Sequence, residues 1–434
     1  MKSIIVKSAC LGAALTFCTQ LSAGEPPNDA RSPGVQVEFL SADMLAKWVV
    51  EANPGVAALA SAAEAASYRV EPAGSLDDPL LSYGFTPRTL DSDRLNQRVE
   101  FGQRIPWPGT LAARQAVARH KAAAAAGDRA ALELEVIAQA RSAHARWWFV
   151  REALEIHHAA ETLVGELIAT AAAGYAAGRS IKQDVLQAEV ERANLDKERL
   201  RLLRLRTTVQ SRINALLNRP PATPLPPASS PGPVREPPPI ETLKMSALAR
   251  HPELARLDAR LAANQSRITL AEKAFYPEFQ VGVGYNSLWD DTDKRPIIGV
   301  TINVPLDRSK RRSELAAARA DSNRSQWMLV QRRAELLDAL AQARAAVVEA
   351  RQSVQLYEND LVPLAGEYLD TAIADYQSGA GAFANVIDAE QRKLATDLAL
   401  ARARADYAEH IAELQRSAGM PHPLPQPELT GVAP

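Results

Sequence analysis

Residues 175–189, YAAGRSIKQDVLQAE, and residues 376–390, YQSGAGAFANVIDAE, decide the fold of this chain, because the second stretch repeats the first 201 positions later. Both contain Tyr-x-x-Gly and, seven residues after that glycine, Val-x-x-Ala-Glu. Three prolines upstream recur in the same order at offsets of 198 or 199: Pro54 and Pro252, Pro79 and Pro277, Pro106 and Pro305. Alanine-rich composition alone would explain shared alanines, but not shared prolines. The sequence therefore predicts that a unit of about 200 residues is duplicated.

Each predicted repeat contains two short segments in which apolar and polar residues alternate. In the second repeat, for example, Phe279, Val281 and Val283 alternate with Gln and Gly. A period of two puts the apolar side chains on one face of a strand and the polar ones on the other. The segments are residues 78–87, 95–105, 277–286 and 296–305. Each has about 9–11 residues, the length that a tilted strand needs to cross a bilayer.

Long helices are predicted after each pair of strands, at residues 109–173, 181–218, 309–374 and 383–418. Apolar residues follow a strict 4-3-4-3 spacing at Leu336, Leu340, Ala343, Val347, Ala350 and Val354, which is typical of a coiled-coil seam. We expect Pro363 to kink or restart its helix, because proline removes one ladder hydrogen bond. The predicted fold class is mainly α with a small β part and an internal two-fold repeat.

The ends and the middle of the chain are predicted to lie outside the repeats. Residues 1–23 resemble a secretory signal peptide, with Lys2 and Lys7 before an apolar run, and hold both cysteines, Cys10 and Cys18. Lipidation of a cysteine stays open. The predicted division is a signal peptide at 1–23, an extension at 24–36, repeats at 37–218 and 241–419, a Pro-rich linker at 219–240 and a Pro-rich tail at 420–434.

Composition and motifs argue against several functions. The 50 basic and 51 acidic side chains give a net charge of −1, which offers no electrostatic reason to bind nucleic acid. No hydrolase triad, Walker loop or nucleotide fingerprint is present, so we predict no enzyme activity and no cofactor. Glu155-x-x-His158 has a ligand-like spacing, but it occurs once where a di-iron bundle needs it twice. We therefore predict no metal site.

Four strands are too few for a membrane barrel, since the smallest barrels have about eight. Open sheet edges in hydrocarbon leave backbone groups without partners, at a cost of several kcal/mol each. The sheet must therefore be completed by other copies of the chain. Three copies supply twelve strands and leave room for water. We predict a homotrimer with a 12-stranded transmembrane β-barrel.

The order of elements and the motif Tyr376-x-x-Gly379 followed by residues 385–390, NVIDAE, resemble the TolC family of outer-membrane efflux channels from about residue 40 to 419. Residues 103–109 and 304–306 are most similar to its heavy-metal, cobalt-zinc-cadmium-type branch. The resemblance implies a passive duct in the outer membrane of a Gram-negative cell. Its large periplasmic portion would be an α-barrel formed by the long antiparallel coiled-coil helices. The duct would dock a periplasmic adaptor (membrane fusion) protein and an inner-membrane pump of RND type, and export small molecules or metal ions.

The resemblance also implies roles for residues at the two helical tips. Those expected to contact the adaptor are Tyr175, Gly178, Gly379 and Gly381; those expected at the periplasmic constriction are Asp388, Asn385, Tyr376 and Asp184. Asn385 stands where the family often has a second acid, so a ring of three carboxylates is expected rather than six. Structural roles are the alternative: glycines permit the turn, and Asp184 suits the first turn of a helix.

Two other functions remain open from the sequence. The first is the outer-membrane duct of a type I protein secretion system. The second, of a different class, is a periplasmic coiled-coil adaptor or scaffold whose hairpins pack in a small β domain. The strands discriminate between these classes, because an adaptor must bury one face of its hairpins in its own chain.

Overall fold

A computed structural model describes residues 38–86, 96–178, 180–287 and 292–421. The predicted signal peptide, the extension and nearly all of the tail lie outside the described residues. Contacts group Val37–Pro434 into one compact unit. It is mainly helical, with one four-stranded sheet, which confirms the predicted fold class. Within the described ranges, no helix has the length and apolar character needed to cross a bilayer.

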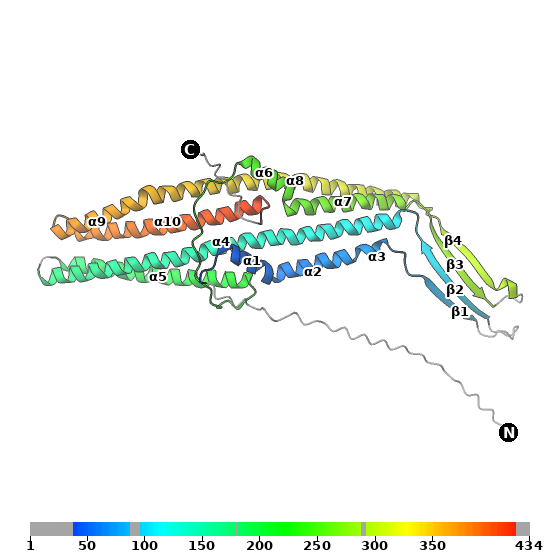
Figure 1. Ribbon diagram of the computed structural model, residues 1–434, viewed down its shortest axis with the longest axis horizontal. Coiled ribbons are helices and arrows are strands. Elements are labelled where there is room, and N and C mark those ends of the chain that lie inside the picture. The colour runs from blue at the N-terminus through cyan, green and yellow to red at the C-terminus, as the bar shows by residue number, and fades with distance from the viewer. Residues whose placement is uncertain (1–37, 87–95, 179, 288–291, 422–434) are drawn as a thin grey trace, which may run out of the picture. The chain divides into compact units, whose positions relative to one another are not determined.

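The two repeats share an order of two helices, two strands and a long helical hairpin; among the described residues, the short helix Val70–Gly74 occurs only in the first, and the long helix after the strands is divided only in the second (Figure 1). The first contains α1 (Ala42–Ala52), α2 (Pro54–Tyr68), α3 (Val70–Gly74), β1 (Leu80–Thr86), β2 (Asn96–Ile105), α4 (Thr110–Ala176) and α5 (Lys182–Leu216). The second contains α6 (Ile240–Arg250), α7 (Pro252–Lys273), β3 (Glu278–Asn286), β4 (Pro296–Asn303), α8 (Arg308–Leu356), α9 (Val362–Ser378) and α10 (Phe383–Ser417). A 3-10 turn, Thr292–Lys294, precedes β4. The predicted internal repeat is thus confirmed.

The repeated prolines begin equivalent helices. Pro54 is the first residue of α2 and Pro252 the first residue of α7, where a missing N–H costs nothing. The preceding side chains cap these helices: Asn53 accepts from Gly55 N–H at 2.9 Å, and His251 accepts from Glu253 N–H at 3.3 Å. The helices that begin at Pro54 and Pro252 are therefore equivalent in the two repeats.

The helix that follows β4 is interrupted, as predicted near Pro363. A π-helical turn, Tyr357–Leu361, separates α8 from α9, and Pro363 is the second residue of α9. The backbone stays helical through this turn, since Leu361 has φ −71° and the Val362 N–H bonds to the Tyr357 carbonyl. In a regular α-helix a proline ring clashes with the carbonyl of residue i−4, and the wider π turn before Pro363 relieves that clash.

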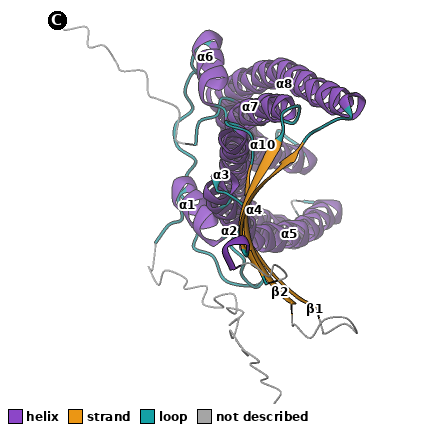
Figure 2. Cartoon of the chain, turned by 90° about the vertical axis from the view of Figure 1, so that its right-hand side faces the viewer, coloured by secondary structure: helices purple, strands orange, loops and turns teal. Residues whose placement is uncertain are grey.

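The four strands form one antiparallel sheet in the order β1-β2-β3-β4, seen as a single curved layer in Figure 2. Its register brings apolar residues together: Phe101 lies opposite both Leu81 and Val283, and Val283 lies opposite Ile298. One face is therefore mainly apolar, with Gln97 and Gln103 as polar exceptions, and Ile298 on it is 82% exposed. The other face carries Gly, Gln, Thr and a pair formed by Arg98 and Glu100 at 2.6 Å. In the described part of the sheet, the outer edges of β1 and β4 have no partner strand.

The helices extend from the sheet to two hairpin turns. α4 has 67 residues, so at about 1.5 Å per residue it spans roughly 100 Å. It packs along α5, α7 and α10, and α8 packs along α7 and α10. The predicted seam is buried, from Leu336 (3% exposed) to Val354 (0%). The helical region thus separates the sheet from the hairpin turns by the length of α4.

The Pro-rich linker crosses the middle of the helices. Leu40 forms a parallel bridge with Ala228, and the indole N–H of Trp147 on α4 donates to the Pro226 carbonyl at 2.9 Å. Farther along, the Tyr407 hydroxyl of α10 donates to the Arg235 carbonyl at 2.8 Å. These contacts hold the linker against both repeats.

Candidate functional site: the paired helical tips

The two hairpin turns, α4 to α5 and α9 to α10, need glycine to reverse the chain. Gly178 and Gly379 have φ angles of 69° and 79°, in the left-handed region that favours glycine. A Cβ atom on Gly381 would lie 2.9 Å from the Asp375 Cβ, so the second turn also requires a glycine for close approach. Tyr175 is half exposed beside the first turn. Three predicted adaptor-contact residues are therefore fully accounted for by turn geometry, and Tyr175 is not.

A shared hydrophobic core joins the two tips. Its buried members come from α4, α5, α9 and α10: Leu167, Ala171, Ala188, Leu369, Ala372, Phe383, Val386, Ile387 and Ala389. Phe383 is 2% exposed, and its ring meets that of Tyr376 edge-on, with centroids 5.1 Å apart. Edge-to-face pairs of this kind contribute about 0.5–1.5 kcal/mol beyond burial. The tips therefore behave as one packed unit within the chain.

Tyr376 connects the two tips electrostatically. Burial raises the pKa of its phenol, the nearby Asp184 carboxylate raises it further, and a hydrogen bond with Ser180 opposes both effects. Because Asp184 and Ser180 belong to the first tip and Tyr376 to the second, two predicted constriction residues, Asp184 and Tyr376, are brought together.

Asp388 is placed differently, in a cluster within the second hairpin. Its Oδ2 accepts from Arg392 Nε at 2.8 Å and from the Tyr368 hydroxyl at 3.3 Å. The Arg392 guanidinium also lies 5.9 Å from the centre of the Tyr368 ring. The hydrogen bond from Arg392 is the main cause that lowers the pKa of Asp388. The carboxylate is thus half exposed and charged, but already paired. Asn385 lies exposed one turn before it.

Sequence reasoning missed a buried acidic pair next to this cluster. Glu390 on α10 is 2% exposed, and neither of its carboxylate oxygens has a hydrogen-bond partner. Burial, and secondly the charge of Glu191 on α5, raise the pKa of Glu390 to about 7. Glu191 itself is 5% exposed and accepts hydrogen bonds from Gln391 and Asn194. Glu390 ends the repeated motif, but only the packing of α10 reveals its burial.

The chain was compared with protein families, curated proteins and solved structures. Residues 243–420 match the family described as "Outer membrane efflux protein", whereas no curated protein matches the chain. The fold is similar to that of the outer membrane protein VceC from Vibrio cholerae, with a TM-score of 0.74, 18% identity, and coverage of 87% of this chain and 96% of that one.

Two further solved structures have the same fold. The MtrE outer membrane channel of Neisseria gonorrhoeae gives a TM-score of 0.72 and 16% identity over 87% of this chain and 89% of that one. The Campylobacter jejuni CmeC outer membrane channel gives a TM-score of 0.71 and 14% identity, over 87% of this chain and 85% of that one. At these identities the likeness establishes the fold, and the family match is confined to residues 243–420.

The second repeat therefore matches the outer membrane efflux protein family, and most of the chain has the fold of the outer-membrane proteins compared. The predicted resemblance to outer-membrane efflux channels is thus confirmed by the family match over residues 243–420 and by the fold over most of the chain. The heavy-metal branch stays a prediction, as do the roles of the tip residues.

Proposed function

We propose that three copies of this chain form a passive duct, the outer-membrane component of a tripartite efflux system. The observation that carries the proposal is the four-stranded sheet, whose apolar face is exposed and whose edges at β1 and β4 lack partner strands in the described residues. Lipid would cover the exposed apolar face. The open edges would be closed by hydrogen bonds between β1 of one copy and β4 of the next.

The polar face of the sheet supports three copies rather than two. Two copies would supply eight strands, whose interior is filled by side chains, whereas twelve strands leave space for water. Glycines at positions 102, 282, 284 and 299 and the charged Arg98 and Glu100 stand on the polar face, as expected for a water-filled lumen. Large exposed apolar side chains on the helices, such as Trp327 (72%), would be covered by neighbouring copies.

The partners follow from the class of protein. The helical tips would contact a periplasmic adaptor protein, and an inner-membrane pump, predicted to be of RND type, would supply the energy. The likeness to channel structures over most of the chain supports a duct rather than a coiled-coil adaptor. Deletion of the gene should raise the intracellular accumulation of a fluorescent pump substrate, and the wild-type gene should restore efflux. Unchanged accumulation in a cell that uses the matching pump would contradict the proposal.

The constriction is proposed to lie at the second tip, where Asp388 accepts from Arg392 and Tyr368. We expect Asp388→Asn to raise the closed-state conductance in planar bilayers by about fivefold or more. The substitution removes the carboxylate that pairs with Arg392 in each of the three copies, so its effects on the closed arrangement add up around the constriction.

The matched control is Asp370→Asn, which removes the same charge from an exposed position on α9. It should leave the closed-state conductance unchanged. Equal conductance of the wild type and Asp388→Asn would remove Asp388 from the gate, while channel formation itself would still support the duct.

A further inference from the structure

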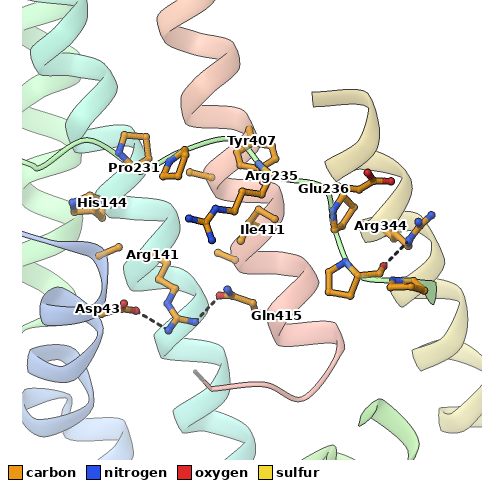
Figure 3. Close-up of a pocket in the computed structure, with 17 residues that line it drawn as sticks. Asp43, Arg141, His144, Pro231, Arg235, Glu236, Arg344, Tyr407, Ile411 and Gln415 are labelled. Carbon is orange, nitrogen blue, oxygen red and sulfur yellow. Dashed lines mark hydrogen bonds and ion pairs between the residues drawn. The ribbon is translucent and has the colours of Figure 1, made fainter. Parts of the chain in front are cut away.

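A cavity of about 740 Å³ lies beneath the Pro-rich linker and is lined by residues of α1, α4, α8 and α10 (Figure 3). This volume falls within the range of sites for small organic molecules. One side of the cavity is formed by prolines of residues 231–239, and the other by the Tyr407 ring, Ile411 and alanines of α10. An apolar body of aromatic size therefore fits between proline rings and Tyr407.

The charges that line the cavity leave a positive excess. Asp43 is paired with Arg141 at 2.9 Å, and Glu236 faces Arg351, outside the lining, at 3.7 Å. Both lining carboxylates thus already have cationic partners.

Two lining guanidinium groups remain without a carboxylate partner among the described residues. Arg344 donates only to the Pro238 carbonyl, at 3.2 Å. The guanidinium of Arg235 has no partner within this part of the chain, and Figure 3 shows it extending into the space between the linker and the helices.

The position of Arg235 is fixed by its backbone. Its N–H donates to the Tyr407 hydroxyl at 2.9 Å, and its carbonyl accepts from the same hydroxyl at 2.8 Å. Gln415 is 6% exposed; its oxygen accepts from Arg141 at 2.6 Å, and its amide NH₂ has no partner in the described structure. His144 contributes no charge, because burial lowers the pKa of its imidazole, whose Nε2–H donates to the Leu40 carbonyl. The Gln415 amide and the unpaired guanidinium groups therefore lie in a cavity whose other lining is apolar.

We propose that this cavity binds an organic anion with an apolar body, such as an aromatic carboxylate. The anion would pair with Arg235 and Arg344 and accept from Gln415, while its ring would pack between the proline rings and Tyr407. The site lies beside the helices at the linker, away from the tips and the sheet, so it is separate from the constriction and does not depend on the transported compound.

The test uses the purified full-length protein in detergent with Cys10 and Cys18 replaced by serine, and one cysteine introduced by Ala408→Cys in the cavity. Labelling rates are compared for an anionic reagent, 2-sulfonatoethyl methanethiosulfonate, and a cationic one of similar size, 2-(trimethylammonium)ethyl methanethiosulfonate. We expect the anionic-to-cationic rate ratio to exceed that of the exposed control Ala172→Cys by about fivefold or more, since unpaired cations attract anions strongly in partly buried sites.

Three further arms make the result specific. Adding Arg235→Glu should reverse the preference, whereas Arg199→Glu on the exposed face of α5 should not change it. Millimolar 2-naphthoate should slow labelling at Ala408→Cys, and neutral 2-naphthamide should not. Equal rates for both reagents, no protection by naphthoate, or no labelling of the assembled protein because another chain fills the cavity would each overturn the proposal.

Discussion

Glu390→Gln is expected to stabilise the protein strongly at alkaline pH and little at acidic pH. The pKa of Glu390 is raised to about 7 in the folded chain, from 4.5. A carboxyl group with a raised pKa favours folding only while it is protonated. Its contribution is therefore complete below pH 4.5 and is lost as the pH rises through 7. The full loss amounts to about 3 kcal/mol per chain.

Urea unfolding of the detergent-purified protein at pH 5 and pH 8.5 measures this difference. The gap in unfolding free energy between the two pH values should shrink in Glu390→Gln by about 3 kcal/mol. The matched control is Glu189→Gln, because Glu189 on α5 is the exposed residue of the first repeat that corresponds to Glu390. A pH gap that is equal in the wild type and Glu390→Gln would show that Glu390 is solvated rather than buried against Glu191.

Phe383→Ala is expected to cost about 3–5 kcal/mol, the usual range for removing a buried phenylalanine. Phe383 lies in the core that joins the two tips and supports the ring of Tyr376. Its loss should loosen the tips locally, because the remainder of α10 packs separately against α4 and α8. Hydrogen exchange of residues 375–395 should accelerate, while exchange in the middle of α4 should not.

Phe383→Leu provides the control, since a hydrophobic replacement of similar volume usually costs less than about 1.5 kcal/mol. It should retain most of the protection of the tip amides. If Phe383→Ala left exchange at the tip unchanged, the shared core would not be what holds the two hairpins together.

The strands and helices could be predicted from the sequence because their signals are local. Alternation from Phe279 to Tyr285 specifies one apolar face, and the 4-3-4-3 spacing from Leu336 to Val354 specifies one buried seam. The path of the linker could not be predicted in this way. Prolines indicate an extended segment, but the bond from Trp147 to Pro226 and the bridge from Leu40 to Ala228 join residues far apart in sequence.

The candidate site could be predicted only in part, because some of its contacts join residues that are far apart in the sequence. Asp388 and Arg392 are four residues apart, a spacing that allows an ion pair on any helix. Arg392 could therefore be predicted from the sequence as the partner of Asp388. The contribution of Tyr368 comes from the opposite helix of the hairpin, 20 residues away. The burial of Glu390 depends on packing between hairpins and has no local signal.

The central claim is that one chain supplies too few strands and that three must share one closed sheet. Native mass spectrometry of the full-length protein, released from detergent micelles, tests it most directly. We expect a dominant species of three chains that survives removal of the detergent. A population made up of single chains would contradict it.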